Sequence, residues 1–242
     1  MGIVVGLFLL IALCYASAGF GGGSSYTALL LWQGEELETV RVVSLACNLI
    51  VAGIGGWMSV KAQRANLKLL GPLLLGAFPG VILGARMSLS GFEWVFGIAL
   101  LVAGLLLILR VQQKEVLKEV ARGKLVPLGF LLGLLAGVTG IGGGIYLVPV
   151  LHLMRAGKTK EVAAVGTWFI LVNSVVGLAV ILMRGGVEPL KEFVMLPIAV
   201  AAGGLIGAQM LQGFFDAVWT RRVTGILVIA VAVRVLWASL QL

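Results

Sequence analysis

The sequence predicts an all-α polytopic membrane protein built from two inverted-topology repeats, each a glycine-broken re-entrant helix hairpin followed by three transmembrane helices. Three observations predict this fold class. Of the 242 residues, 60% are hydrophobic and only 12% are charged. Apolar blocks of about 17 to 22 residues recur between short polar joints. The same landmarks occur twice along the chain. This composition excludes a soluble globular protein.

The clearest landmark is a glycine run that occurs in both repeats. FGGG at 20–23 returns as IGGG at 141–144, and each run follows one apolar stretch and precedes another. Other landmarks repeat at nearly the same offset: LK at 67–68 and 190–191, GA at 84–85 and 207–208, and Phe at 92 and 215. The chain therefore divides into a first inverted repeat, 1–110, a basic linker, 111–124, and a second inverted repeat, 125–242.

The apolar blocks follow the same order in each repeat. An apolar arm leads to the glycine break, a short arm follows, and three longer blocks come next. The first repeat is expected to hold a short arm at 24–33 and helices near 39–60, 67–88 and 92–110. The second is expected to hold a short arm at 145–154 and helices near 161–183, 190–211 and 222–240. The opening segment lacks the basic region of a signal peptide, so we expect it to belong to the folded protein.

Charges in the joints predict the orientation of the chain in the membrane. Residues 110–124 carry five Lys and Arg against two Glu, which places this linker in the cytoplasm by the positive-inside rule. Counting back across the helices puts the loop with Lys61 and Lys68 inside and the loop with Glu36 outside. Corresponding loops of the two repeats then fall on opposite faces, and such inversion is typical of secondary transporters.

The two short arms cannot cross the membrane. Ten helical residues extend ~15 Å, about half of the ~30 Å hydrocarbon layer. We therefore expect each hairpin to enter from one face, turn inside the membrane and return, with the two tips meeting near the midplane. Backbone at that depth is tolerated only where protein or an aqueous cavity satisfies it, so the tips are expected to line a cavity. The alternative is that the glycines serve only close helix packing.

Each tip has the features of an anion site. The short arm begins there, and its first N–H groups lie unpaired at the positive end of the helix dipole. Glycine adopts positive φ without strain and lets a ligand approach the backbone. Hydroxyls add donors, and more of them stand at the first break. The candidate substrate-binding residues at the breaks are Gly19, Phe20, Gly21, Gly22, Gly23, Ser24 and Ser25 in the first repeat and Thr139, Gly140, Ile141, Gly142, Gly143 and Gly144 in the second.

Two polar residues on the first long helix of each repeat complete the candidate site: Ser44 and Asn48 in the first repeat, and Thr167 and Asn173 in the second. An Asn in hydrocarbon needs a hydrogen-bond partner, so these residues either form hydrogen bonds between helices or contact the ligand. Both interpretations stay open. Arg41, near the outer end of its helix, is expected to extend its side chain to the surface.

The distribution of the remaining polar residues excludes several function classes. All ten acidic residues fall in joints or at helix ends, which disfavours a proton pump with a central carboxylate, a cation channel with an acidic ring, and a metal-dependent membrane enzyme. No catalytic residue, metal site or cofactor is expected. Nucleic acid is not an expected partner, because the net charge of +8 lies in the joints. The two cysteines are interpreted as packed thiols.

The motifs GFGGGSSYTALLLW and GVTGIGGGIYLVPVL, with the GAR and GAQ sequences that end later helices, resemble those of the sulfite exporter TauE/SafE family. The resemblance covers the whole chain. It implies a multi-pass permease of the plasma membrane for a small anionic substrate such as sulfite, sulfoacetate or another sulfonate. We expect alternating access, with the bilayer and a second copy in a homodimer as partners. The alternatives are a passive anion channel, a transporter of another small organic anion, and a membrane-embedded scaffold or enzyme.

Overall fold

The computed structural model describes residues 2–64, 66–87, 120–184 and 193–213, with scattered residues between 97 and 109 and between 222 and 237. In these ranges the regular structure is helical, as predicted. The helices are α1 (Gly2–Ala16), α2 (Gly23–Trp32), α3 (Leu37–Lys61), α4 (Leu67–Gly84), α6 (Arg122–Thr139), α7 (Gly144–Met154), α8 (Thr159–Met183) and α9 (Met195–Gly213). The helices expected near 92–110 and 222–240 lie largely outside the described residues.

The observed bounds follow the apolar blocks, with three adjustments. Helix α4 stops at Gly84, short of the predicted 88, and α9 is displaced toward the C-terminus, ending at Gly213 where 211 was expected. Helix α6 begins at Arg122, so the last residues assigned to the linker form its first turn. The early start of α6 has a simple cause: Arg and Lys are good helix formers, so a charged segment beside an apolar block joins the helix.

In the described part of the chain, four helices are long and apolar enough to cross a membrane: the spans are Glu38–Lys61, Leu67–Gly84, Arg122–Thr139 and Thr159–Met183. The arms α2 and α7 have 10 and 11 residues, which is too short to cross.

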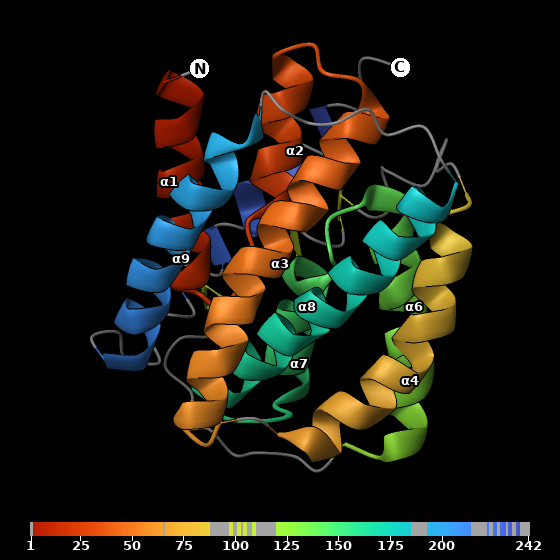
Figure 1. Cartoon of the computed structure of the whole chain (residues 1–242). Coiled ribbons are helices and arrows are strands. Elements are labelled where there is room, and N and C mark those ends of the chain that lie inside the picture. The colour runs from red at the N-terminus through yellow and green to blue at the C-terminus, as the bar shows by residue number, and fades with distance from the viewer. Residues whose placement is uncertain are drawn as a thin grey trace.

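The two longest helices, α3 and α8, pack against each other at the centre of the molecule and run in opposite directions (Figure 1). The contacts along the pair show this antiparallel order. Trp168 donates from Nε1 to Ser59 Oγ over 3.2 Å near the end of α3, whereas Gly177 lies against Leu45 nearer its start. The pair forms the frame to which both glycine breaks attach.

Helices α4 and α6 form a close parallel pair beside this centre. Their contact is built on glycines at four-residue spacing, which lie on one face of each helix. The glycines are Gly76, Gly80 and Gly84 on α4 and Gly129, Gly133 and Gly137 on α6, each facing the backbone of the other helix. Glycine is required here because a Cβ at any of these positions would meet backbone atoms, and small residues let helices in a membrane approach closely.

Helices α1 and α9 form a second parallel pair at the opposite side of the molecule (Figure 1). Gly203 faces the backbone of Leu9, and one turn later Gly207 faces that of Leu13. Each of these pairs joins helices that are distant in the sequence: α1 packs on α9, and α4 packs on α6. The long-range contacts therefore interlock the N-terminal and C-terminal parts of the chain.

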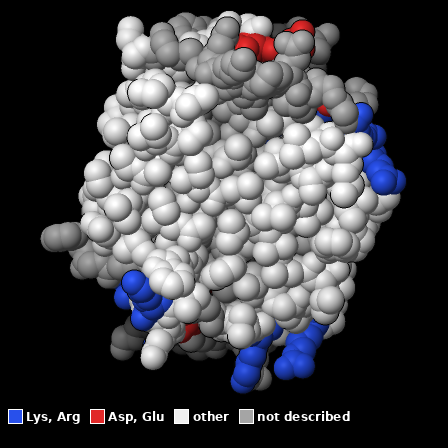
Figure 2. Space-filling view, viewed as in Figure 1, with Lys and Arg blue, Asp and Glu red and all other residues white. Residues whose placement is uncertain are grey.

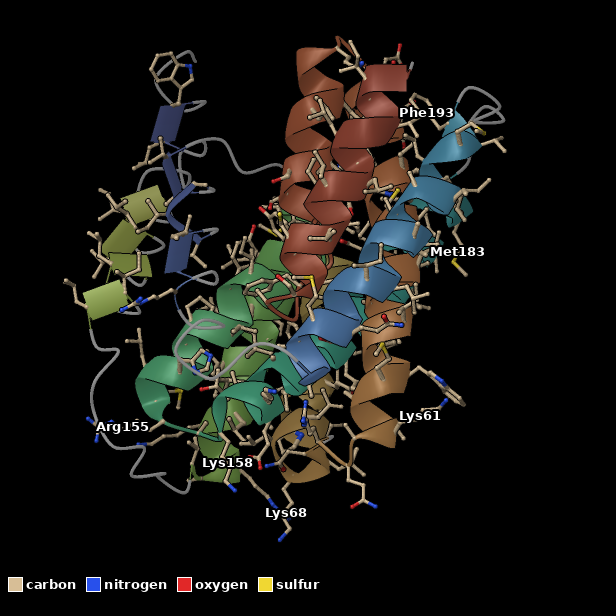
Figure 3. The ribbon with its side chains drawn as sticks, turned by 90° about the vertical axis from the view of Figure 1, so that its left-hand side faces the viewer. Lys61, Lys68, Arg155, Lys158, Met183 and Phe193 are labelled. Carbon is tan, nitrogen blue, oxygen red and sulfur yellow. The ribbon has the colours of Figure 1, made fainter. Side chains whose placement is uncertain are left out.

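Charged side chains lie mainly toward the ends of the helices. In Figure 3, Lys61, Lys68, Arg155 and Lys158 lie at one end, and Phe193 lies at the other. On the face shown in Figure 2, acidic atoms gather at the top and most basic atoms at the lower edge and the right-hand rim, with a broad uncharged band between. Large apolar side chains are exposed around the molecule, including Leu75, Phe78, Met183 and Ile198. Such a band suits contact with lipid tails.

Candidate functional site

The first glycine break lies between α1 and α2. Helix α1 ends at Ala16 and α2 begins at Gly23. Gly19 and Gly22 have φ of +83° and +91°, a region that costs side-chain-bearing residues energy and suits glycine. The chain reverses across this turn. The ring of Phe8 on α1 stacks on that of Tyr26 on α2, with centroids 4.6 Å apart, which shows that the two helices lie side by side.

The second break lies between α6 and α7 and uses the same backbone device. Gly140, Gly142 and Gly143 have φ of +68°, +80° and +81°. Gly140 caps the end of α6, and Gly143 is the N-cap of α7. A hydrogen bond from Tyr146 Oη to Thr139 Oγ1, 3.2 Å long, ties the first turn of α7 to the last turn of α6. Thr139 itself donates to the carbonyl of Leu135 over 2.7 Å.

The two breaks meet at the side chain of Asn48, which is fully buried. The N–H of Gly23, at the start of α2, donates to Asn48 Oδ1 over 2.9 Å. Asn48 Nδ2 donates to the carbonyl of Ile141 in the second break over 3.1 Å. Asn48 lies 11 residues after the start of α3 and 13 before its end, about 16–20 Å from either. The breaks therefore meet about halfway along the central helices.

Helix α8 also contacts both breaks. Thr167 Oγ1 lies 3.0 Å from the carbonyl oxygen of Gly19 and 2.9 Å from that of Ala163, to which it can donate. Asn173 Nδ2 donates to the carbonyl of Gly142 over 3.4 Å. The structure thus brings together Asn48, Thr167 and Asn173 from the central helices with glycines from both breaks.

The hydroxyls that the sequence assigned to the first break contact other side chains. Tyr15 Oη lies 3.1 Å from Ser24 Oγ and 2.8 Å from Ser25 Oγ, both within hydrogen-bond distance. Ser44 accepts from Thr27 Oγ1 over 3.0 Å, so it joins α3 to α2. Phe20 is buried in the core. The hydroxyl-rich first break is therefore held by its own hydrogen bonds.

Arg41 corrects one sequence-based expectation. Its side chain does not simply extend to the surface: Nη2 donates to the carbonyl of Val138 over 2.8 Å, and its aliphatic stem covers Gly140. The cause is the end of α6, where the last carbonyls have no helical partner and attract a cation. A positive charge consequently lies beside the second break.

Sequence reasoning also missed three residues near the breaks. Tyr26 Oη and Ser174 Oγ are buried and have no hydrogen-bond partner in the part of the chain that the structure describes. Tyr15 Oη lies within hydrogen-bond distance of the two serines of α2. Ser174 could have been found, because it directly follows Asn173 in an otherwise apolar block. The two tyrosines give no such signal, since aromatic residues in apolar segments are usually core residues.

The backbone of both breaks is largely buried in this structure: residues 15–24, 140 and 142–149 are buried, and Ile141 is partly exposed. A groove of about 340 Å³ lies elsewhere, between α3 and α9, and is lined by Cys47, Phe193 and Pro197 among others. Within the described part of the chain, no three His, Cys, Asp or Glu side chains lie close enough to hold a metal ion.

Apolar helices of membrane-spanning length, with a hydrophobic exterior, define a multi-pass membrane protein. The sequence profile of the sulfite exporter TauE/SafE family matches residues 4–235, and the chain belongs to this family of membrane transporters. This result confirms the resemblance drawn from the two glycine motifs.

Known relatives carry transporter names. The chain is 31% identical to the probable membrane transporter protein y4hK of Sinorhizobium fredii, over 95% of this chain and 96% of that protein. It is 24% identical to the probable membrane transporter protein YunE of Bacillus subtilis, over 86% and 87%. It is also 24% identical to MamO of Paramagnetospirillum magneticum, another probable membrane transporter protein, of which the match covers 41%. No solved structure matches the chain.

Proposed function

We propose that this protein is a secondary transporter that moves a small sulfur-containing anion, such as sulfite or a sulfonate, by alternating access. The anion would bind where the two glycine breaks meet. The observation that carries the proposal is the bridge made by Asn48, which joins Gly23 at the start of α2 to Ile141 beside the start of α7. Two helix N-termini and irregular backbone therefore lie together midway along the central helices.

The electrostatics of this region favour an anion. The positive ends of the α2 and α7 dipoles lie at the breaks, and Arg41 adds a full positive charge beside the second. The acidic residues in the described part of the chain, Glu35, Glu36, Glu38 and Glu161, stand at helix ends or in joints. A cation would meet donors and positive dipoles here, whereas an anion would be stabilised by both.

Inverted repeats would explain the packing of the helices. If 1–110 and 125–242 are equivalent, α1 corresponds to α6, α3 to α8, and α4 to α9. The contacts obey this rule: the pairing of α1 with α9 has its counterpart in α6 with α4, and that of α3 with α9 in α8 with α4. Each hairpin would then enter from its own face, with the linker 111–124 in the cytoplasm.

Alternating access follows from this arrangement. The buried breaks correspond to an occluded state, in which neither face reaches the site. Separation of the α1–α2 hairpin from α8 would break the contact of Thr167 with Gly19 and open one side. Separation of the α6–α7 hairpin from α3 would break the contact of Arg41 with Val138 and open the other.

Uptake into proteoliposomes holding the purified protein tests the proposal. Radiolabelled sulfite and sulfoacetate are added outside, with or without unlabelled anion trapped inside. A carrier shows saturable uptake that trapped anion accelerates. A passive channel, the alternative, gives flux without acceleration. Empty liposomes are the control, and a complete lack of flux for these anions and for a panel of small carboxylates would rule out the proposed function.

A further inference from the structure

The two breaks differ in how far their polar groups are satisfied, and this difference has a consequence for the proposed function. At the first break, Asn48 accepts from Gly23 N–H, and Tyr15 lies within hydrogen-bond distance of both serines of α2. At the second, the N-cap of α7 is Gly143, which has no side chain to accept from the first N–H groups of the helix.

Two polar atoms beside the second break are buried and have no hydrogen-bond partner among the described residues: Ser174 Oγ and Asn173 Oδ1. Ser174 is fully buried and Asn173 is 2% exposed. Ser174 Oγ faces the glycines at the start of α7, and the amide of Asn173 lies beside them through its Nδ2. A Cβ built on Gly142 would lie 2.9 Å from Ser174 Oγ, and one on Gly143 would lie 3.3 Å from Asn173 Nδ2. The second break is thus lined by unpaired groups on the α8 side.

An unpaired serine is unusual in this molecule. Two other buried hydroxyls bond to the backbone of their own helix: Ser59 donates to the carbonyl of Gly56, and Thr167 can donate to that of Ala163. Such back-bonding is the ordinary solution for Ser and Thr in membrane helices. Ser174 lacks it, although an unsatisfied buried polar group costs about 1–3 kcal/mol. A ligand would recover that cost.

The chemistry of the two groups specifies the ligand. The hydroxyl of Ser174 can donate, but the carbonyl of Asn173 can only accept. The hydrogen bond from Asn173 Nδ2 to the Gly142 carbonyl fixes the orientation of the amide. The positive end of α7 and the nearby Arg41 require a negative charge. A matching ligand therefore carries one negative charge, accepts hydrogen bonds, and has one O–H to donate.

We propose that the second break, with Ser174 and Asn173, is the site of tightest anion contact, and that it takes a singly protonated oxyanion such as hydrogen sulfite. Ser174 donates to one oxygen of the anion, and the protonated oxygen donates to Asn173 Oδ1. The first break acts as a closed, structural wall. The inference rests on the proposed transport function and adds to it the charge state of the substrate and a binding residue, Ser174.

Uptake of sulfite and of methanesulfonate into proteoliposomes, measured across neutral pH, tests this inference. Both anions present sulfonyl-type acceptor oxygens, but methanesulfonate is a monoanion with no O–H. Wild-type protein should prefer sulfite, and its sulfite uptake should fall as alkali converts hydrogen sulfite into the dianion. Methanesulfonate uptake should stay weak and constant with pH. Equal transport of both anions with no pH dependence would overturn the role of Asn173.

Variants distinguish the roles of Ser174 and Asn173. Ser174→Ala should raise the KM for both anions by about tenfold, because a hydrogen bond to a charged group is lost. Asn173→Leu should remove the preference for sulfite over methanesulfonate. Ser59→Ala is the matched control, because that buried hydroxyl lies near the end of α3, away from both breaks, and donates to its own helix, and its KM should equal that of wild type. If Ser174→Ala does not reconstitute, Ser174→Cys keeps the shape with a weaker donor.

The outcomes are distinguishable from failure of the proposed function. Wild-type protein that transports neither sulfite, sulfonates nor carboxylates refutes the transporter proposal itself. Active wild-type protein with an unchanged KM in Ser174→Ala or Ser174→Cys overturns the inference alone. In that case a bound water would satisfy the two buried groups.

Discussion

The amide of Asn48 donates to the carbonyl of Ile141 over 3.1 Å, across 93 residues of sequence. The same amide accepts the N–H of Gly23, so one side chain joins the two non-helical turns in the centre of the protein. Backbone groups at such depth have no water to bond. Asn48 supplies the partner that each turn lacks.

Asn48→Leu should therefore destabilise the protein strongly. The variant leaves the Gly23 N–H and the Ile141 carbonyl buried without their partner, at about 1–3 kcal/mol each. We expect a clearly lower midpoint of thermal unfolding in detergent, measured by intrinsic fluorescence. Thr27→Val is the control, because it removes one hydroxyl contact with Ser44 and leaves the backbone of both breaks satisfied. Equal losses in the two variants would argue against the bridging role.

Substitution on α4 should distinguish glycines that pack against α6 from glycines that can be replaced without cost. A Cβ at Gly76 would collide with the backbone of Val126, whereas a Cβ at Gly71, on the same helix, meets nothing within 4 Å. Gly76→Ala should destabilise by about 1–3 kcal/mol or more, because backbone must move. Gly71→Ala should be neutral or stabilising, since Ala favours helix. Unfolding in a mixed-detergent titration measures both, and similar behaviour would refute close packing here.

Arg41 should influence transport through its charge. Arg41→Gln removes the cation beside the second break and its hydrogen bond to Val138. We expect the KM for the transported anion to rise by about tenfold, since charge-assisted hydrogen bonds are stronger than neutral ones. Arg86→Gln is the control, because Arg86 is exposed beyond the end of α4, and its KM should stay within about twofold of wild type. A loss in both variants would point to general surface charge instead.

The predicted orientation can be tested by cysteine labelling. In a background carrying Cys14→Ala and Cys47→Ala, an impermeant maleimide is applied to right-side-out vesicles. Glu36→Cys should react from outside, and Lys68→Cys should react only after the membrane is opened. Both native side chains are exposed in the structure. The reverse labelling pattern would mean that the helices face the other way.

The sequence by itself determined the class of the protein and the position of its breaks. Apolar blocks predict α3, α4 and α8 because membrane helices bury hydrophobic length locally, and the two glycine runs predict interruptions because positive φ is a property of single residues. The transporter family followed from the same motifs. Asn48 and Asn173 were identified as polar residues that require partners, although their partners were not.

Only the tertiary structure decided which groups meet. One partner of Asn48 is 93 residues away, and Arg41 turns to Val138 on another helix. The hydroxyl of Ser174 is left without a hydrogen bond among the described residues. The sequence indicates a first break richer in hydroxyls, yet Tyr15 contacts the hydroxyls of Ser24 and Ser25 there. Hydrogen-bond satisfaction depends on the packing of helices that are distant in the chain, so no local pattern of residues specifies it.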